Sequence, residues 1–186
     1  MAGERKQQIL ETLAKMLEAP KREKITTASL AAKLEVSEAA LYRHFANKAQ
    51  MFEGLIEFIE RTIFGLINKI SAEETDGSRQ VQRMITMLLV FAEKNPGMTR
   101  VLIGDALVNE DEKLQLRINQ LYDRIEVTLK QSLRIAETQT DKKSDAEAQA
   151  NLMICYVIGR WNQYAKSGFK RKPTEFVQQQ LGLFKF

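Results

Sequence analysis

The side chains best suited to recognising a ligand lie close together in this sequence. Tyr42, Arg43 and His44 are consecutive, and Asn47 and Lys48 follow after two further residues. A guanidinium group can form two hydrogen bonds to the edge of a guanine in the major groove of DNA. Hydroxyl, imidazole and ammonium groups can bind phosphates, which position a protein on the duplex. The cluster therefore predicts contacts to DNA.

Catalysis is not indicated by any residue pattern in the chain. His44 is the only histidine, so a Ser-His-Asp or Cys-His group would have to lie inside the predicted DNA-contacting segment. The single cysteine, Cys155, is far away in the sequence and has no zinc-ligand spacing. Glycine-rich phosphate loops and clusters of metal-ligating residues are also absent from the sequence. We therefore expect no enzyme activity, no cofactor and no metal.

Capping residues around the cluster predict a helix-turn-helix over residues 24–48. Thr26 is suited to cap a first helix at about 27–34, and Ser37 is suited to cap a second one at about 38–44. Two residues remain for the turn, which lacks the glycine that is frequent there. Leu30 and Leu41 are on the faces that would hold the two helices together.

The outward face of the second predicted helix suits the major groove. Ala39 and Ala40 are small enough to let the helix backbone approach base edges, and Arg43 is the candidate for a guanine contact. Asn47 is suited to cap the next helix, whose free N–H groups would bind phosphate together with Lys48. The residues expected to contact DNA are Thr26, Thr27, Ser37, Glu38, Ala39, Ala40, Tyr42, Arg43, His44, Asn47 and Lys48.

A helical corner with solvated charges would produce a similar pattern, but the exact residues favour a known module. LYRHFANK, at 41–48, resembles the end of the recognition helix of TetR-type repressors, and ITTASLAAKLEVSEAALYRHF extends the resemblance over the whole module. The resemblance implies an all-α, TetR-like fold. It would have an N-terminal three-helix helix-turn-helix domain at 1–47 and a C-terminal helical body at 48–186 for dimerisation and partner binding.

Charge and hydropathy agree with a DNA-binding protein of the cytoplasm. Of the net charge of +4, the first 50 residues carry +3. No apolar run is long enough to span a membrane, and the charged start MAGERKQQ has no signal-peptide core after it. The charged loop PKREK, at 20–24, is expected to be solvated, with phosphate contact as the alternative.

Apolar residues at helical spacing predict helices throughout the rest of the chain. The polar stretch ETQTDKKSD, at 137–145, is expected to be a mobile loop, and Cys155 is expected to fill a core. The run LMICYVIG, at 152–159, is apolar almost all round and predicts burial in a dimer interface. The predicted helices lie at about 4–19, 48–71, 79–94, 96–102, 112–135, 145–166 and 174–181.

Several stretches of the body resemble one branch of the TetR-type proteins, the nucleoid occlusion factors. They are MFEGLIEFIER, FAEKNPGMTRVLIGDAL, INQLYDRIE and FKRKPTE. The resemblance implies a nucleoid-associated homodimer that binds chromosomal palindromes and, when bound to DNA, engages the division protein FtsZ and disrupts its ring. The branch's arginine on the fourth helix is replaced by Leu66. The partner-binding residues that the resemblance implies are Phe58, Arg61 as a candidate substitute, Met87, Lys94 and Asn95.

Two other functions remain open at the level of the sequence. A ligand-responsive repressor would need a pocket in the body, and the apolar stripes carry few inward polar residues, although a hydrophobic effector pocket would have the same pattern. A structural protein that bridges DNA segments is the other alternative. We expect no small-molecule ligand.

Overall fold

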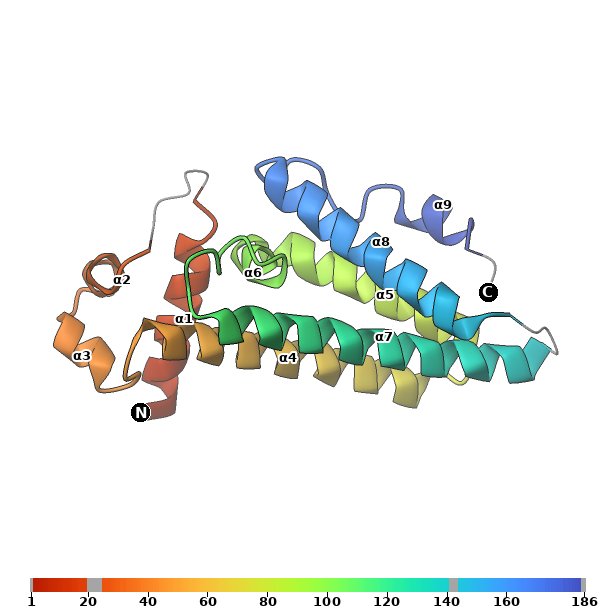
Figure 1. Ribbon diagram of the computed structural model, residues 1–186, viewed down its shortest axis with the longest axis horizontal. Coiled ribbons are helices and arrows are strands. Elements are labelled where there is room, and N and C mark those ends of the chain that lie inside the picture. The colour runs from red at the N-terminus through yellow and green to blue at the C-terminus, as the bar shows by residue number, and fades with distance from the viewer. Residues whose placement is uncertain (1, 20–24, 141–143, 185–186) are drawn as a thin grey trace. The chain divides into compact units, whose positions relative to one another are not determined.

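The computed structural model describes residues 2–19, 25–140 and 144–184, and in these residues the secondary structure is entirely helical (Figure 1). The predicted PKREK loop lies outside the described residues. By packing, the chain forms two compact units. The first consists of the described parts of Met1–Ile59 and Asn95–Ile118, and the second of Glu60–Lys94 and Asn119–Phe186. Each unit is described by itself.

The first unit contains the predicted DNA-binding helices together with one whole helix and the start of another from much later in the chain. Its helices are α1 (Ala2–Met16), α2 (Thr27–Lys33), α3 (Glu38–Tyr42), the first part of α4 (Lys48–Glu73), α6 (Pro96–Leu102) and the start of α7 (Glu112–Thr140). Helix α1 packs against both α2 and α6. Among the residues buried in this unit are Ile9, Leu13, Leu30, Leu41, Phe45 and Met51.

Gly97 allows α6 to approach α1 very closely. A Cβ atom added at Gly97 would lie 1.9 Å from the carbonyl oxygen of Ala14 and 3.3 Å from the Cβ of Leu17. Only a residue without a side chain permits this distance between the helices. Pro96 occupies the first turn of α6, as predicted, where its missing N–H costs nothing. The close contact fixes α6 against α1, which also packs against α2 of the helix-turn-helix.

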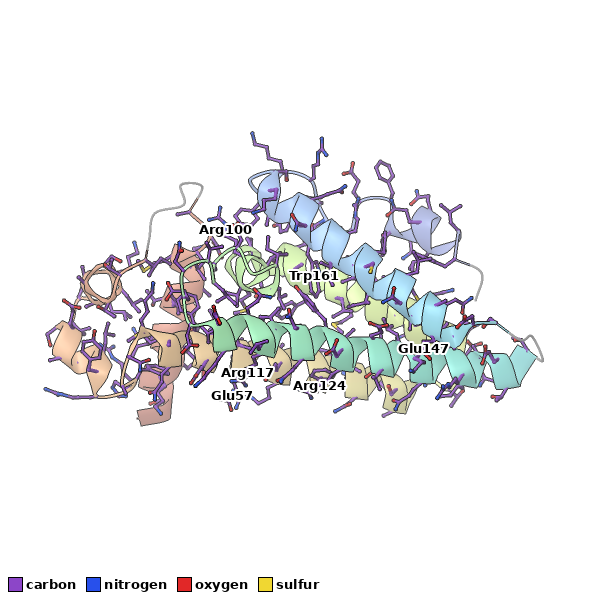
Figure 2. All side chains as sticks on the ribbon, in the orientation of Figure 1. Glu57, Arg100, Arg117, Arg124, Glu147 and Trp161 are labelled. Carbon is purple, nitrogen blue, oxygen red and sulfur yellow. The ribbon has the colours of Figure 1, made fainter. Side chains whose placement is uncertain are left out.

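The second unit contains the rest of α4 and α7 together with α5 (Gly77–Lys94), α8 (Ala146–Lys166) and α9 (Val177–Leu181). Helices α5 and α8 lie side by side (Figure 1). Trp161 points from α8 into the unit, where it is fully buried and donates from Nε1 to the carbonyl oxygen of Leu88 at 3.1 Å (Figure 2). The ring of Tyr122 lies 6.3 Å from that of Trp161, and burial raises the pKa of the Tyr122 hydroxyl. Aromatic side chains therefore fill the centre of this unit.

Helix α7 is longer than the sequence predicted. It was expected to end near residue 135, before a mobile loop, but it continues to Thr140. Gln139 accepts a hydrogen bond from the N–H of Gly77 at 2.9 Å and donates one to the carbonyl oxygen of Thr75 at 2.7 Å. The loop prediction was wrong for 137–140 because the Gln139 side chain bonds to backbone groups at and just before the start of α5. Residues 141–143 lie outside the described part.

The last two helices confirm one predicted start and correct another. Asp145 caps α8 by accepting from the N–H of Ala148 at 3.0 Å. Helix α9 begins at Val177, not near residue 174, because Arg160 holds the preceding segment in an irregular path. Its guanidinium group donates at 2.8 to 3.1 Å to the carbonyl oxygens of Lys172, Pro173 and Glu175.

The prediction that Cys155 fills a core is wrong within the single chain. Cys155 is exposed, and Leu152, three residues earlier on the same face of α8, is 57% exposed. Ile154, in contrast, is 3% exposed and belongs to the core of the chain itself. The apolar run of α8 therefore has one side turned inward and one side turned to solvent.

We predict that replacing Gly97 by alanine destabilises the protein. The added Cβ would overlap the backbone of α1, so we expect the free energy of unfolding to fall by about 1–3 kcal/mol. Gly65→Ala, in the interior of α4, is the matched control. An added Cβ there has no neighbour within 4 Å, so helix propensity should stabilise it by up to about 1 kcal/mol. Urea unfolding of both variants measures the difference, and equal stability of Gly97→Ala and the parent would contradict the packing described.

Candidate DNA-binding interface

The turn between α2 and α3 forms without glycine because Glu35 adopts the left-handed conformation, with a φ of 56°. The N–H groups of Glu35 and Val36 donate to the carbonyl oxygens of Ala32 and Ala31, which closes the end of α2. A residue with a side chain costs roughly 1–2 kcal/mol in this conformation. The tight turn is therefore retained although its most favourable residue is missing.

Reciprocal hydrogen bonds hold the start of α2, and a single one holds the start of α3. The Thr26 hydroxyl accepts from the N–H of Ser29 at 3.0 Å, and the Ser29 hydroxyl accepts from the N–H of Thr26 at 3.1 Å. The sequence predicted the Thr26 cap but missed this capping box, since Glu or Gln is the usual third residue. Ser37 accepts from the N–H of Ala40 at 3.3 Å, as predicted. Helix α3 ends at Tyr42, about two residues earlier than expected.

A small hydrogen-bonded group joins three of the predicted DNA-contacting residues between α2 and α3. The Thr27 hydroxyl donates to the carboxylate of Glu38 at 2.6 Å, and the Tyr42 hydroxyl donates to the Thr27 oxygen at 3.4 Å. Glu38 thus orients the Thr27 hydroxyl, whose oxygen in turn accepts from Tyr42. The arrangement fixes a side chain suited to phosphate contact, Tyr42, which is 46% exposed.

The remaining predicted residues of the recognition helix face solvent to different degrees. Ala39 is exposed, and Ala40 is half-buried. Arg43 is exposed at the C-terminal end of α3, where its long side chain can reach beyond the helix. His44 is half-buried directly after it. Arg43 is therefore the exposed cationic side chain at the end of this helix.

The start of α4 is capped as the sequence predicted. The Asn47 side chain accepts from the N–H of Gln50 at 2.9 Å. Gln50 reaches back to the N–H of Ala46, also at 2.9 Å, and not to that of Asn47. These bonds fix the first turn of α4, from which Lys48 projects.

Lys48 is held by an acidic side chain that sequence reasoning missed. Its ammonium group forms an ion pair with the carboxylate of Glu110, which lies between α6 and α7. The two side chains are only 23% and 14% exposed. Lys48 Nζ also lies 5.5 Å from the centre of the Phe52 ring. Because 62 residues separate Lys48 from Glu110, no local pattern in the sequence could have indicated the pair.

The residues expected to bind a protein partner are found in two stretches of sequence. Phe58 is half-buried on α4, and the exposed Arg61 follows one turn later on the same side. Met87 is half-buried on α5, whose last residue is the exposed Lys94, and the half-buried Asn95 follows directly.

Glu93, the residue before Lys94, forms hydrogen bonds and an ion pair within the second unit. Burial raises the pKa of the Glu93 carboxyl, but hydrogen bonds from Thr174 and Lys172 and the charge of Lys172 outweigh it, so the pKa lies below its ordinary value. Glu93 is therefore ionised near neutral pH, and its partners hold it beside Lys94.

Two kinds of site are missing from the part of the chain that the structure describes. Its helices include none that is long and apolar enough to cross a membrane. Within the same residues, histidine, cysteine and carboxylate side chains do not gather in groups of three or more that could hold a metal ion.

The fold and its N-terminal module match those of known regulators. The family model of the bacterial regulatory proteins of the TetR family matches residues 9–55. A TetR-family regulator PfmR from Thermus thermophilus has a TM-score of 0.78, with 21% identity over 94% of this chain and 95% of that one. A TetR transcription regulator from Haloarcula marismortui has a TM-score of 0.80, with 16% identity over 97% and 95%. The all-α, TetR-like fold is confirmed.

Matches over the body of the chain show to which branch of the TetR-type proteins it belongs. The model of the SlmA-like, tetracyclin repressor-like C-terminal domain matches residues 76–186. The nucleoid occlusion factor SlmA of Alteromonas mediterranea is 53% identical over 183 residues, with 97% of this chain and 94% of that protein covered. SlmA of Shewanella pealeana is 50% identical over 95% of this chain and 94% of its own length. The chain belongs to the SlmA family of nucleoid occlusion factors, a branch of the TetR-type DNA-binding regulators.

We predict that Arg43→Ala relaxes the sequence preference at one base pair of the binding site. The loss of a two-bond contact to guanine should reduce discrimination there by about 1–3 kcal/mol. Selection of binding sites from random duplex DNA, followed by titration of single-base variants, measures it. Lys69→Ala on α4, whose side chain is 69% exposed, is the control that removes a positive charge elsewhere. A uniform loss of affinity for all sequences would contradict a base contact by Arg43.

Proposed function

We propose that the protein, bound as a homodimer to palindromic sites on the chromosome, antagonises the assembly of FtsZ over the nucleoid. It would accordingly act in the cytoplasm, associated with the nucleoid. The observation that supports this most strongly is the similarity to nucleoid occlusion factors across the body at 76–186. Helix-turn-helix modules occur in regulators with many different functions. The similarity of the body therefore supports a specific protein partner more strongly than the N-terminal module does.

A dimer is supported by the apolar side chains that α7 and α8 turn to solvent. On α8, Leu152 is 57% exposed and Cys155 is exposed, and on α7, Val127 and Ile135 are 47% and 39% exposed. Large apolar side chains gathered on neighbouring helices are typical of a surface that another protein covers. A second copy would bury the same surface twice under two-fold symmetry. Its two recognition helices would then contact a palindrome in successive major grooves, about 34–36 Å apart.

We predict that Leu152→Glu converts the dimer into folded monomers, because it places a charge in the covered surface. Sedimentation velocity measures the mass. Leu183→Glu, which changes a leucine that is 81% exposed in the same unit, is the control and should remain dimeric. A charge at Ile154 is not a useful test, since that residue lies in the core of the chain. An unaltered dimer in soluble Leu152→Glu would exclude this face as the interface.

The residues proposed to bind the partner are Phe58 and Arg61 of α4, Met87 and Lys94 of α5, and Asn95. Arg61 lies about 60° around the helix axis from Phe58, but about 140° from position 66 at 3.6 residues per turn. Arg61 therefore adds a charge beside Phe58 and does not replace the arginine that Leu66 displaces. We expect partner binding to depend more on Phe58, Lys94 and Asn95 than on position 66.

We predict that the parent protein lowers FtsZ polymer mass when palindromic DNA is present and that Phe58→Ala loses this effect. Removing the ring deletes the apolar anchor of the proposed surface while leaving the DNA-contacting residues unchanged. Light scattering and pelleting of purified FtsZ measure the polymer.

Phe64→Ala is the matched control for the loss of a phenylalanine on α4. Phe64 is half-buried like Phe58, and its ring lies under the guanidinium of Arg124 at 3.9 Å. Both variants should remain dimeric and keep their DNA affinity. If folded Phe58→Ala still inhibits FtsZ like the parent, the partner surface lies elsewhere. If the parent has no effect on FtsZ with DNA bound, the proposed function itself fails.

A ligand-responsive repressor is the weaker alternative. Some solved structures with this fold are described as complexes, such as FadR of Bacillus subtilis with stearoyl-CoA. The identity to that protein is only 13%, which supports the fold alone. In this chain the fully buried Trp161 fills the centre of the second unit.

A further inference from the structure

The Lys48 ammonium group, which we expect to bind a DNA phosphate, is engaged in the ion pair with Glu110. Lys48 lies in the first turn of α4, where the free N–H groups of the helix also favour an anion. In the free protein the Lys48 ammonium group is paired with the Glu110 carboxylate. A phosphate of the duplex would need the same ammonium group.

Glu110 is held in place by the packing of the first unit. The N–H of Glu110 donates to the carbonyl oxygen of Leu107 at 3.0 Å, and that of Leu107 donates to Gly104 at 3.0 Å. Gly104 and Asn109 have left-handed backbones, with φ values of 76° and 66°. The segment follows α6, which Gly97 fastens to α1. Glu110 is therefore presented to Lys48 by a turn that belongs to the DNA-binding unit.

A cavity beside the pair gives both side chains room to move. It has a volume of about 270 Å³ and contains Lys48 and Glu110 in its wall. Neither side chain has to displace a packed apolar residue to swing away from the other. The other residues of the wall are Leu17, Ile25, Phe52, Arg100, Asp105, Ala106, Val108 and Asn109.

Electrostatics make the two anions competitors. Glu110 and an approaching phosphate repel each other, and only 23% of the Lys48 side chain is exposed, so the ammonium group cannot be shared freely with a second anion. An ion pair that is partly shielded from water is screened less by salt than a surface pair. Binding of DNA through Lys48 therefore has to include the cost of separating it from Glu110.

We propose that Glu110 is a positioning residue that lowers DNA affinity by holding Lys48 until a phosphate displaces it. This inference rests on the phosphate contact of Lys48 that the proposed function includes. It assigns to the segment between α6 and α7 a role in setting how tightly the protein binds the duplex. Displacement would leave the Glu110 carboxylate in the cavity, so each binding event would also change the charge pattern of this segment.

The test compares Glu110→Gln with Glu112→Gln on the full-length protein. Glu110→Gln keeps the shape of the side chain and removes its charge, and we expect affinity for duplex DNA to rise roughly three- to tenfold at moderate salt. Glu112→Gln, an exposed residue two positions later, changes the net charge equally and should alter affinity by less than about twofold. Fluorescence anisotropy over a range of salt concentrations measures both.

Lys48→Ala separates this mechanism from a structural role of Glu110. This variant should bind all duplexes more weakly, by a similar factor for each. It should also reduce the slope of log affinity against log salt concentration by about 1. In the Lys48→Ala background, Glu110→Gln should lose most of its effect, because no ammonium group remains to be released. A loss of loop structure alone would not produce this dependence on Lys48.

Three results would overturn the inference. They are an unchanged affinity in Glu110→Gln, a reduced affinity in it, or an equal gain with and without Lys48. Because phosphate contacts do not depend on base sequence, the same measurement on a non-palindromic duplex tests the inference even if the protein proves to have no effect on FtsZ. If Glu110→Gln does not fold, Glu110→Asp, which shortens the side chain and weakens the pair, should still raise affinity above that of the parent.

Discussion

The close approach of α6 to α1 is the constraint on which the first unit depends. At Gly97 the two helices leave no space for even a methyl group, so α6 is fixed against the helix that supports the helix-turn-helix. The turn after α6 then carries Glu110 to Lys48 at the start of α4. The DNA-binding part of the molecule is thus completed by residues about 50 positions beyond the module that the sequence marks. The predicted division into a helix-turn-helix domain at 1–47 and a helical body at 48–186 stays a prediction.

Local interactions made much of this architecture predictable. Thr26, Ser37 and Asn47 cap helices where the sequence placed the caps, because a capping side chain bonds to backbone only three residues away. Pro96 begins α6 for a similarly local reason. Helix periodicity likewise identified the buried stripes, since 3.6 residues per turn fixes which side chains share a face.

What the sequence could not predict depends on partners that are distant in the chain. The extension of α7 requires Gln139 to meet Gly77, and the position of Lys48 requires Glu110. Cys155 was misplaced because an apolar run looks the same whether its neighbours belong to the same chain or to a second copy. Glu35 adopts a left-handed backbone conformation, which is unfavourable for a residue with a side chain. The packing of α2 against α3 offsets this cost. The partner surface was predicted from resemblance alone, and its residues carry no local signature of their own.

The most direct test of this account is a crystal structure of the protein bound to a palindromic duplex. The account predicts that Lys48 Nζ lies about 2.7–2.9 Å from a phosphate oxygen, with the Glu110 carboxylate more than about 4 Å away from it. An intact ion pair between Lys48 and Glu110 in the complex, with no phosphate at Lys48, would contradict it.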